Sequence, residues 1–234
     1  MANEQVNTIA KMGNNGDMPI QISVLGPSTW GKTAFITSAR AGLSKIMPSD
    51  YKCDYSHWAA IHDKWNLTRG KQDPTSGTTV YGFNITGRRT EKRVIIMDYR
   101  GAITFSRTAD ESHQTIVEQR GLSCWVESSD LVIILFDDRV ITKNPLNDLG
   151  TVEEYLDEVL EIYCERGTKN TALVMTHIDE VGNADEIFGL ARGVAIKKGI
   201  RREMIFQSNN KKWKGAMTPP SILISALQEC ELIE

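Results

Sequence analysis

A chain of 234 residues with 41% hydrophobic residues has room for one α/β domain with a substantial core, and two full domains would be cramped. The net charge of −3 excludes a global attraction to nucleic acid or to an anionic membrane, so such a partner would need a local basic patch. The four cysteines lie far apart without a C-x-x-C pair, which indicates reduced thiols rather than a zinc site or a disulfide framework.

Residues 1–18 are polar and rich in asparagine and glycine, which predicts a flexible tail. The start of the chain lacks the apolar core of a signal peptide, and the longest aliphatic or aromatic run, residues 131–136, is too short to cross a bilayer. We therefore expect a cytoplasmic protein whose single domain covers residues 19–234.

Short apolar runs predict six strands, at residues 20–25, 79–86, 93–98, 131–136, 172–176 and 222–225. Helical patterns separate them, at residues 34–46, 109–126, 151–163 and 184–198. Strands that alternate with helices predict a three-layer, doubly wound α/β fold with a six-stranded, mostly parallel sheet. The second and third strands follow each other closely, so we expect one antiparallel hairpin strand.

Two segments exceed ordinary loop length, at residues 44–78 and 199–220. The first carries four tyrosine and tryptophan side chains and a helix-like pattern at residues 56–66. An ordered insertion at about residues 45–74 is therefore more consistent with the sequence than a structureless loop.

The octet GPSTWGKT, residues 26–33, lies between the first predicted strand and the first predicted helix. It matches the P-loop pattern G-x-x-x-x-G-K-[ST], in which successive backbone N–H groups surround a β-phosphate because glycine permits a close approach. In such a loop Lys32 bridges the β- and γ-phosphates, Thr33 places its hydroxyl on Mg²⁺, and the helix N-terminus favours the anion. The residues expected to contact the nucleotide here are Gly26, Ser28, Thr29, Trp30, Gly31, Lys32, Thr33 and Ala34.

The third predicted strand ends in Asp98-Tyr99-Arg100-Gly101, a D-x-x-G sequence. At the carboxyl end of a strand beside the phosphate loop, Asp98 can hold Mg²⁺ through water. The Gly101 N–H can reach a γ-phosphate because no side chain blocks its approach. The sequence therefore predicts a metal site at Asp98.

The fifth predicted strand ends in Thr176-His177-Ile178-Asp179. A carboxylate at this place can accept hydrogen bonds from both N1–H and the exocyclic amine of guanine, a pair of donors that adenine does not offer. The sixth predicted strand ends in Ser225-Ala226, whose backbone N–H groups would face the guanine carbonyl. Because ligands of such sheets bind at carboxyl strand ends, the order of these motifs predicts a guanine-nucleotide site.

These motifs resemble those of P-loop GTPases of the Ras-like, translation-factor-related (TRAFAC) class, and the resemblance covers residues 19–228. It implies a Ras-like G domain with Mg²⁺ and bound GTP or GDP, two switch segments that order around the γ-phosphate, and hydrolysis of GTP to GDP and phosphate. The family's N-K-x-D and S-A-K motifs correspond to residues 176–179 and 225–227. The further nucleotide contacts that this implies are Thr176, His177, Asp179, Ser225, Ala226 and Leu227.

The switch threonine of the family corresponds to Thr75, Thr78 or Thr79. The sequence Gly77-Thr78-Thr79 looks like the G-T-T of Era-like GTPases, which favours Thr79, with Thr78 second. Its hydroxyl would join Mg²⁺ and its carbonyl would help to place the attacking water. The resemblance thus implies Thr33, Thr79 and Asp98 as metal ligands, and Lys32, Thr79 and Gly101 as catalytic residues.

Three features depart from the family pattern. Thr176 and His177 replace the asparagine and lysine of the guanine motif, so the preference for guanine rests on Asp179. Ala102 follows the D-x-x-G, where many small GTPases have a glutamine that orients water, and this predicts slow intrinsic turnover. The chain also ends soon after residue 225, so we expect either a trimmed chain or a substitute for the long last helix of the fold.

The leading hypothesis is a GTP-hydrolysing molecular switch that acts on a protein effector and is assisted by an activating protein. The missing catalytic group would come from that partner or from Arg100, Arg107 or His113. The alternative is a GTP-binding scaffold or regulatory domain with little or no hydrolysis, which acts through a nucleotide-dependent dimer or an adjoining domain. A third reading, an ATPase or a nucleotide kinase, would make the guanine motif accidental. The basic residues between 192 and 214 are expected to be a solvated face, with no firm nucleic-acid or membrane signal.

Overall fold

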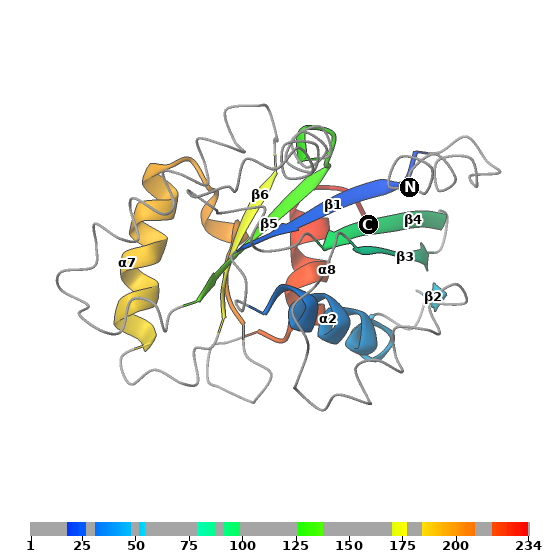
Figure 1. The fold of residues 1–234 in the computed structure, drawn as a ribbon, viewed down its shortest axis with the longest axis horizontal. Helices are drawn as coiled ribbons and strands as arrows, with labels where there is room; N and C mark the ends of the chain where they lie inside the picture. Colours follow the sequence, from blue (N-terminus) through cyan, green and yellow to red (C-terminus); the bar gives the residue numbers. More distant parts are fainter. Residues whose placement is uncertain are drawn as a thin grey trace, which may run out of the picture.

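The computed structural model describes residues 18–26, 31–47, 52–54, 79–87, 91–98, 126–137, 170–176, 184–208 and 217–233. In these ranges it contains one sheet of seven strands in the order β2-β3-β4-β1-β5-β6-β7 (Figure 1). The strands are β1 (Ile20–Leu25), β2 (Lys52–Asp54), β3 (Thr79–Thr86), β4 (Glu91–Asp98), β5 (Leu131–Asp137), β6 (Thr171–Thr176) and β7 (Ile205–Gln207). The helices are α2 (Lys32–Ile46), α7 (Ala184–Lys197) and α8 (Pro219–Glu229), with a short 3-10 helix η3 (Arg202–Met204) before β7.

Neighbouring strands from β4 to β7 run parallel, whereas β3 runs antiparallel to both β2 and β4. The predicted α/β class, the mostly parallel sheet and the antiparallel hairpin are confirmed. Five of the six predicted strands lie within two residues of their expected bounds. The sheet has seven strands, whereas six were predicted. Two of the observed strands, β2 and β7, were not predicted, and one predicted strand is helical.

The core lies on both faces of the central strands. The side chains of residues 131–136 are almost completely buried, as are those of Ile22, Val24 and Leu25 in β1. Such continuous apolar strands need cover on two sides. The chain crosses from β1 to the β2 edge through α2, and from β6 to the opposite edge through α7, so right-handed connections place α2 and α7 on opposite faces. Figure 1 shows α7 on one side of β5 and β6, and α2 with α8 on the other.

The predicted strand at residues 222–225 is wrong, because these residues belong to α8. Pro219 and Pro220 occupy the first two helical positions, where a missing N–H costs nothing. The buried side chains that follow repeat at helical spacing, at Ile222, Leu223, Ala226 and Leu227. A short apolar run does not by itself distinguish a strand from a buried helix, and this one is helical.

Helix α8 is the last helix in the part of the chain that the structure describes, and it packs on α2. The two helices are in close contact at Gly42, where a methyl group would lie 2.5 Å from Cγ of Pro220. The expectation of a trimmed chain or a substitute for the long last helix rested on a strand that ends at residue 225, and that strand is wrong. Residues 205–207 were predicted to lie in a long loop, but they form the strand β7. Residues 219–229, later in the chain, form α8.

The structure describes residues 45–47 and 52–54 of the expected insertion at residues 45–74. Its first residues complete α2, and Lys52–Asp54 form the edge strand β2, paired with residues 84–86 of β3. The expected helix at residues 56–66 lies outside the described residues, as do residues 1–17 of the expected tail and the predicted helix at 151–163. Of the helix predicted at 109–126, only residue 126 is described, and it is helical. None of the helices in the described ranges combines the length and apolar character that spanning a membrane requires.

The close contact between α2 and α8 gives a stability test. Gly42→Ala is expected to lower the free energy of unfolding by about 1–3 kcal/mol, because the new methyl group overlaps the rigid ring of Pro220. On an open helix face the same change would stabilise by about 1 kcal/mol, so the sign of the change reports the contact. Denaturant unfolding measures it. The double variant with Pro220→Ala should regain most of the loss, and simply additive effects would contradict the contact.

Candidate functional site

The carboxyl ends of β1 and β4 lie side by side, because the two strands are parallel neighbours with Val24 opposite Asp98. On its other side β1 pairs with β5. The chain leaves β1 toward the β2 edge of the sheet and leaves β5 toward the β7 edge, so the strand order reverses between β1 and β5. In open α/β sheets the crevice at such a reversal is where ligands bind.

Two glycines delimit the loop that joins β1 to α2. Gly26 has φ of 154°, and a Cβ at this position would lie 3.3 Å from the carbonyl oxygen of Leu135 in β5. Gly31 is the N-cap of α2 and has the left-handed φ of 83°. Both backbone conformations favour glycine, which accounts for the two predicted loop glycines. Between them, Ser28, Thr29 and Trp30 lie outside the described residues.

Lys32 is the first residue of α2, and its side chain reaches back to Gly26 at the end of β1. The ammonium donates a 2.7 Å hydrogen bond to the carbonyl oxygen of Gly26, and the side chain is only 6% exposed. Burial lowers the pKa of Lys32 from 10.5 to about 8, and the negative charge of Asp98 partly offsets this shift. A buried ammonium at a glycine loop is suited to an anionic ligand, because the ligand would favour the charged form.

Thr33 joins the start of α2 to the end of β4. Its hydroxyl donates a 2.6 Å hydrogen bond to Oδ2 of Asp98, which has no exposed surface. The second carboxylate oxygen, Oδ1, is buried and accepts no hydrogen bond. Burial raises the pKa of Asp98, while the Thr33 hydrogen bond and the positive charge of Lys32 oppose that rise. Two predicted metal-binding residues, 65 positions apart in the chain, are thus in direct contact.

Strand β3 brings the backbone of Thr79 to the same edge, where it lies opposite Asp98 in the antiparallel register. Lys32, Thr33, Asp98 and the backbone of Thr79 therefore converge at the ends of β1, β3 and β4. The alternative switch residues Thr75 and Thr78 lie outside the described residues, as do Gly101, Ala102 and the candidate catalytic residues Arg100, Arg107 and His113.

The carboxyl end of β6 lies two strands from β1. Thr176 is buried there, and its hydroxyl donates a 3.3 Å hydrogen bond to the carbonyl oxygen of Phe136 in β5. This hydrogen bond links the end of β6 to β5. The residues that follow, His177 and Asp179, lie outside the described residues.

The prediction that Ser225 and Ala226 end a strand, on which their expected place beside a base rested together with that of Leu227, is wrong. These residues lie inside α8, where backbone N–H groups are used in hydrogen bonds to carbonyls one turn earlier. The two prolines that open the helix were the sequence signal for it.

The strand beside β6 is β7, and its carboxyl end is fixed by two backbone hydrogen bonds. The Ser208 N–H donates to Met175 at 2.7 Å, and the Met217 N–H donates to Gln207 at 2.9 Å. The strand end that could face a ligand bound beside β6 is therefore that of Gln207 and Ser208.

Two side chains outside the predicted site residues are also withdrawn from water. Tyr81 of β3 is 5% exposed, and Arg40 of α2 has a buried Nε. Burial raises the pKa of Tyr81; the charge of Asp98 adds to the rise and that of Arg40 opposes it. The only sequence signal for Tyr81 was its position two residues after Thr79 in a strand, which places both on one face.

In the part of the chain that the structure describes, no group of three or more His, Cys, Asp or Glu side chains could hold a metal ion. A metal ion at this edge would therefore draw on Asp98 together with hydroxyl, water or ligand oxygens, as Mg²⁺ commonly does.

A scan against models of protein families matches none, and a search of curated proteins finds no match. Function has to be inferred from the residues at this edge of the sheet.

The buried carboxylate predicts a trade between stability and ligand binding. Asp98→Asn is expected to raise the free energy of unfolding of the ligand-free protein at pH 7 by about 1–3 kcal/mol, because it removes a buried charge with one unpaired oxygen. A raised carboxyl pKa means that the folded state loses stability as pH rises from the ordinary value of 3.8 through the folded value. The difference between variant and wild type should therefore grow as the pH rises above about 4. Thermal unfolding at several pH values measures it, and a variant less stable than wild type at pH 7 would contradict the assignment.

Proposed function

We propose that the chain is a P-loop GTPase of the Ras-like, translation-factor-related class, which binds GTP and GDP with Mg²⁺ and hydrolyses GTP slowly without a partner. The observation that carries the proposal is the pair of contacts at the start of α2. Lys32 reaches the first loop glycine, Gly26, and Thr33 reaches Asp98 on the neighbouring strand. The G-x-x-x-x-G-K-[ST] and D-x-x-G patterns place these residue types there for phosphate and metal binding.

The side chains present fit a Mg²⁺ ion. Asp98 Oδ1 is an orphaned, buried, negatively charged oxygen, and the Thr33 hydroxyl bonds the other oxygen of the same carboxylate. Mg²⁺ prefers such hard oxygen donors and completes its shell with water and phosphate oxygens. In the proposed complex Thr33 and Asp98 hold the metal, with Thr79 as the third residue. A metal ion held there would neutralise negative charge on the phosphates.

The loop residues would then hold the phosphates. Lys32 neutralises the β- and γ-oxygens, the Gly101 N–H reaches the γ-phosphate, and the Thr79 carbonyl helps to place the attacking water. The helix N-terminus at Gly31 adds N–H donors and a positive partial charge.

The choice of guanine rests on Asp179, which follows β6 directly. The backbone N–H groups proposed to face the guanine carbonyl come from the chain after β7 rather than from residues 225–227, because β7 is the strand beside β6. Thr176 contributes by bracing β6 against β5, and His177 is proposed to cover the base.

Slow hydrolysis follows from Ala102, which cannot orient water. A cytoplasmic switch of this kind needs an activating protein for turnover and an effector that distinguishes its two nucleotide states. Ala102 also favours a second candidate function, a GTP-binding scaffold with little hydrolysis that works through a dimer or an adjoining domain.

The central experiment measures the affinity of the purified protein for GDP, GTP and ATP with and without Mg²⁺, together with phosphate release. We expect Mg²⁺-dependent binding of both guanine nucleotides and weak ATP binding. The rate of GTP turnover should be on the order of 10⁻⁴ s⁻¹, as in unassisted switches, or lower. Equal affinity for ATP would reject the guanine assignment. Tight GTP binding without any turnover would select the scaffold.

Base recognition is tested by Asp179→Asn. If the carboxylate reads the N1–H and the exocyclic amine, the amide variant should bind xanthine nucleotides better than guanine nucleotides. Competition between GDP and xanthosine diphosphate measures the exchange of preference. Glu180→Gln, which changes the neighbouring carboxylate in the same way, is the matched control and should keep the guanine preference.

Proton linkage tests the role of Lys32. With a free pKa of about 8, Lys32 is mostly neutral at pH 8.5, and a bound phosphate should recharge it. GDP binding at pH 8.5 is expected to take up roughly three quarters of a proton, and affinity should fall by up to about tenfold per pH unit above pH 8. Calorimetry in buffers of different ionisation enthalpy measures the uptake. Lys32→Met should bind more weakly and lose the uptake, and an unchanged uptake would assign it to another group.

A further inference from the structure

A buried hydrogen-bond donor at the β7 edge of the sheet lacks an acceptor. Gln207 is the last residue of β7, and its side chain is only 8% exposed. Its Nε2 is buried and has no hydrogen-bond partner among the residues that the structure describes. An unpaired amide in this position costs folding free energy, which an acceptor would restore. Such a group in a native protein therefore points to a bound molecule.

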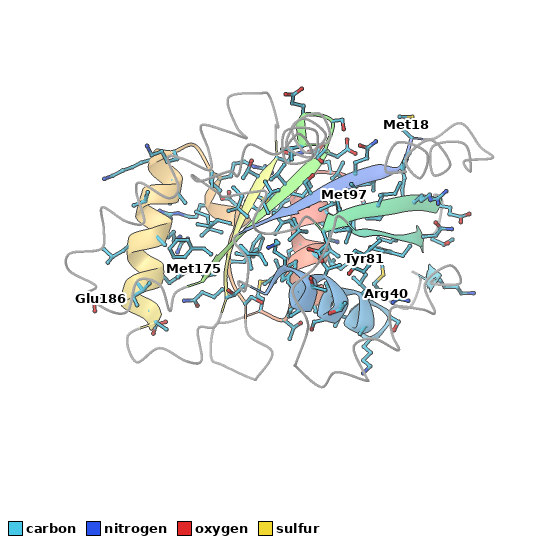
Figure 2. All side chains as sticks on the ribbon, viewed as in Figure 1. Met18, Arg40, Tyr81, Met97, Met175 and Glu186 are labelled. Atoms are coloured by element: carbon cyan, nitrogen blue, oxygen red, sulfur yellow. The ribbon has the colours of Figure 1, made fainter. Side chains whose placement is uncertain are left out.

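The backbone that carries this amide is fixed by its neighbours. Gln207 lies opposite Met175 of β6, and its carbonyl oxygen accepts a 2.9 Å hydrogen bond from the Met217 N–H. Residues that are paired in register share a face of the sheet, and Figure 2 shows Met175 in the space between β6 and α7. The side chain of Gln207 thus leaves the carboxyl end of β7 on the face that α7 covers.

A second buried atom without a partner lies at another strand end. It is Oδ1 of Asp98, at the carboxyl end of β4. Both ends lie at the same edge of the sheet, because neighbouring strands from β4 to β7 run parallel. One end offers a negatively charged acceptor, which suits a cation, and the other offers a neutral donor, which suits a carbonyl oxygen. Three strands lie between them, so a ligand that satisfies both atoms is extended.

The proposed guanine nucleotide has a matching acceptor. With its N1–H and exocyclic amine assigned to Asp179, the neighbouring atom on the same edge of the base is the carbonyl oxygen, which needs donors. Thr176, at the end of β6, already donates its hydroxyl hydrogen to the carbonyl oxygen of Phe136. Adenine carries an amine at the corresponding position and would bring a second donor to Nε2 of Gln207.

We propose that Gln207 is a specificity-determining residue of the nucleotide site, and that its side-chain amide donates a hydrogen bond to the carbonyl oxygen of the guanine base. This inference rests on the proposed function and adds a residue that no motif contains. Burial makes such a donor selective, because a ligand without an acceptor leaves it unpaired in a site that water does not reach.

Gln207→Met tests the proposal, because it keeps the length of the side chain and removes the donor. GDP affinity is expected to fall about tenfold. The matched ligand is thioguanosine diphosphate, which keeps N1–H and replaces the carbonyl oxygen by sulfur, a weak acceptor. Wild-type protein should prefer GDP to this analogue in titration calorimetry, and the variant should lose most of that preference. The melting temperature of the ligand-free variant should be no lower than that of wild type, because an unpaired buried amide has been removed.

Phe206→Leu is the matched control. Phe206 is 7% exposed in the same strand, and alternation places it on the opposite face of the sheet. The control should lower the melting temperature and keep the preference for GDP over the analogue.

Three outcomes would overturn the role of Gln207 while GTP binding stays intact. They are an unchanged preference in Gln207→Met, a lower melting temperature with both affinities reduced equally, and wild-type protein that does not distinguish the two ligands. Wild-type protein that binds no guanine nucleotide at all would overturn the proposed function as well.

Discussion

The hydrogen bond from the Thr33 hydroxyl to the Asp98 carboxylate is the contact on which the site depends. It holds the first turn of α2, the helix that follows β1, against the end of the neighbouring strand β4. The chain can make this contact only if it turns sharply between β1 and α2, and the unusual backbone of Gly26 and Gly31 permits that turn. The same turn brings Lys32 back to the Gly26 carbonyl. Loop, helix start and strand end are thus parts of one local arrangement.

This arrangement contains two buried ionisable groups whose charges are only partly compensated. Asp98 is fully buried with one oxygen unpaired, and Lys32 is so desolvated that its pKa falls to about 8. Buried charges of this kind cost folding stability unless partners compensate them. A metal ion on the carboxylate and a phosphate on the ammonium would supply that compensation, and ligand binding would then stabilise the folded state by mass action. The same buried charges therefore lower the folding stability and favour the binding of a charged ligand.

The two ends of the proposed site are held apart by the sheet itself. Four strand spacings separate β4, which carries Asp98, from β7, which ends beside β6, a distance of about 19 Å at roughly 4.8 Å per strand. A ligand that touches both ends is necessarily extended, with its anionic part at β1 and β4 and its other end at β6 and β7. Helix α8 connects the two ends. It begins just after Met217, whose N–H donates to the carbonyl oxygen of Gln207 at the end of β7, and it packs on α2.

Local sequence patterns are enough to predict the strands β1, β3, β4, β5 and β6, because each is an apolar run whose burial requires a sheet. They also predict the loop glycines and the candidate partners Thr33 and Asp98, because these residues belong to short local motifs. Packing between distant elements decides that Thr33 and Asp98 touch, that residues 222–225 are helical, and that Tyr81 lies on the same face of the sheet as Asp98. Those outcomes depend on which elements pack together: a short apolar run can serve a strand or a helix, and contacts between residues far apart in the chain leave no local pattern.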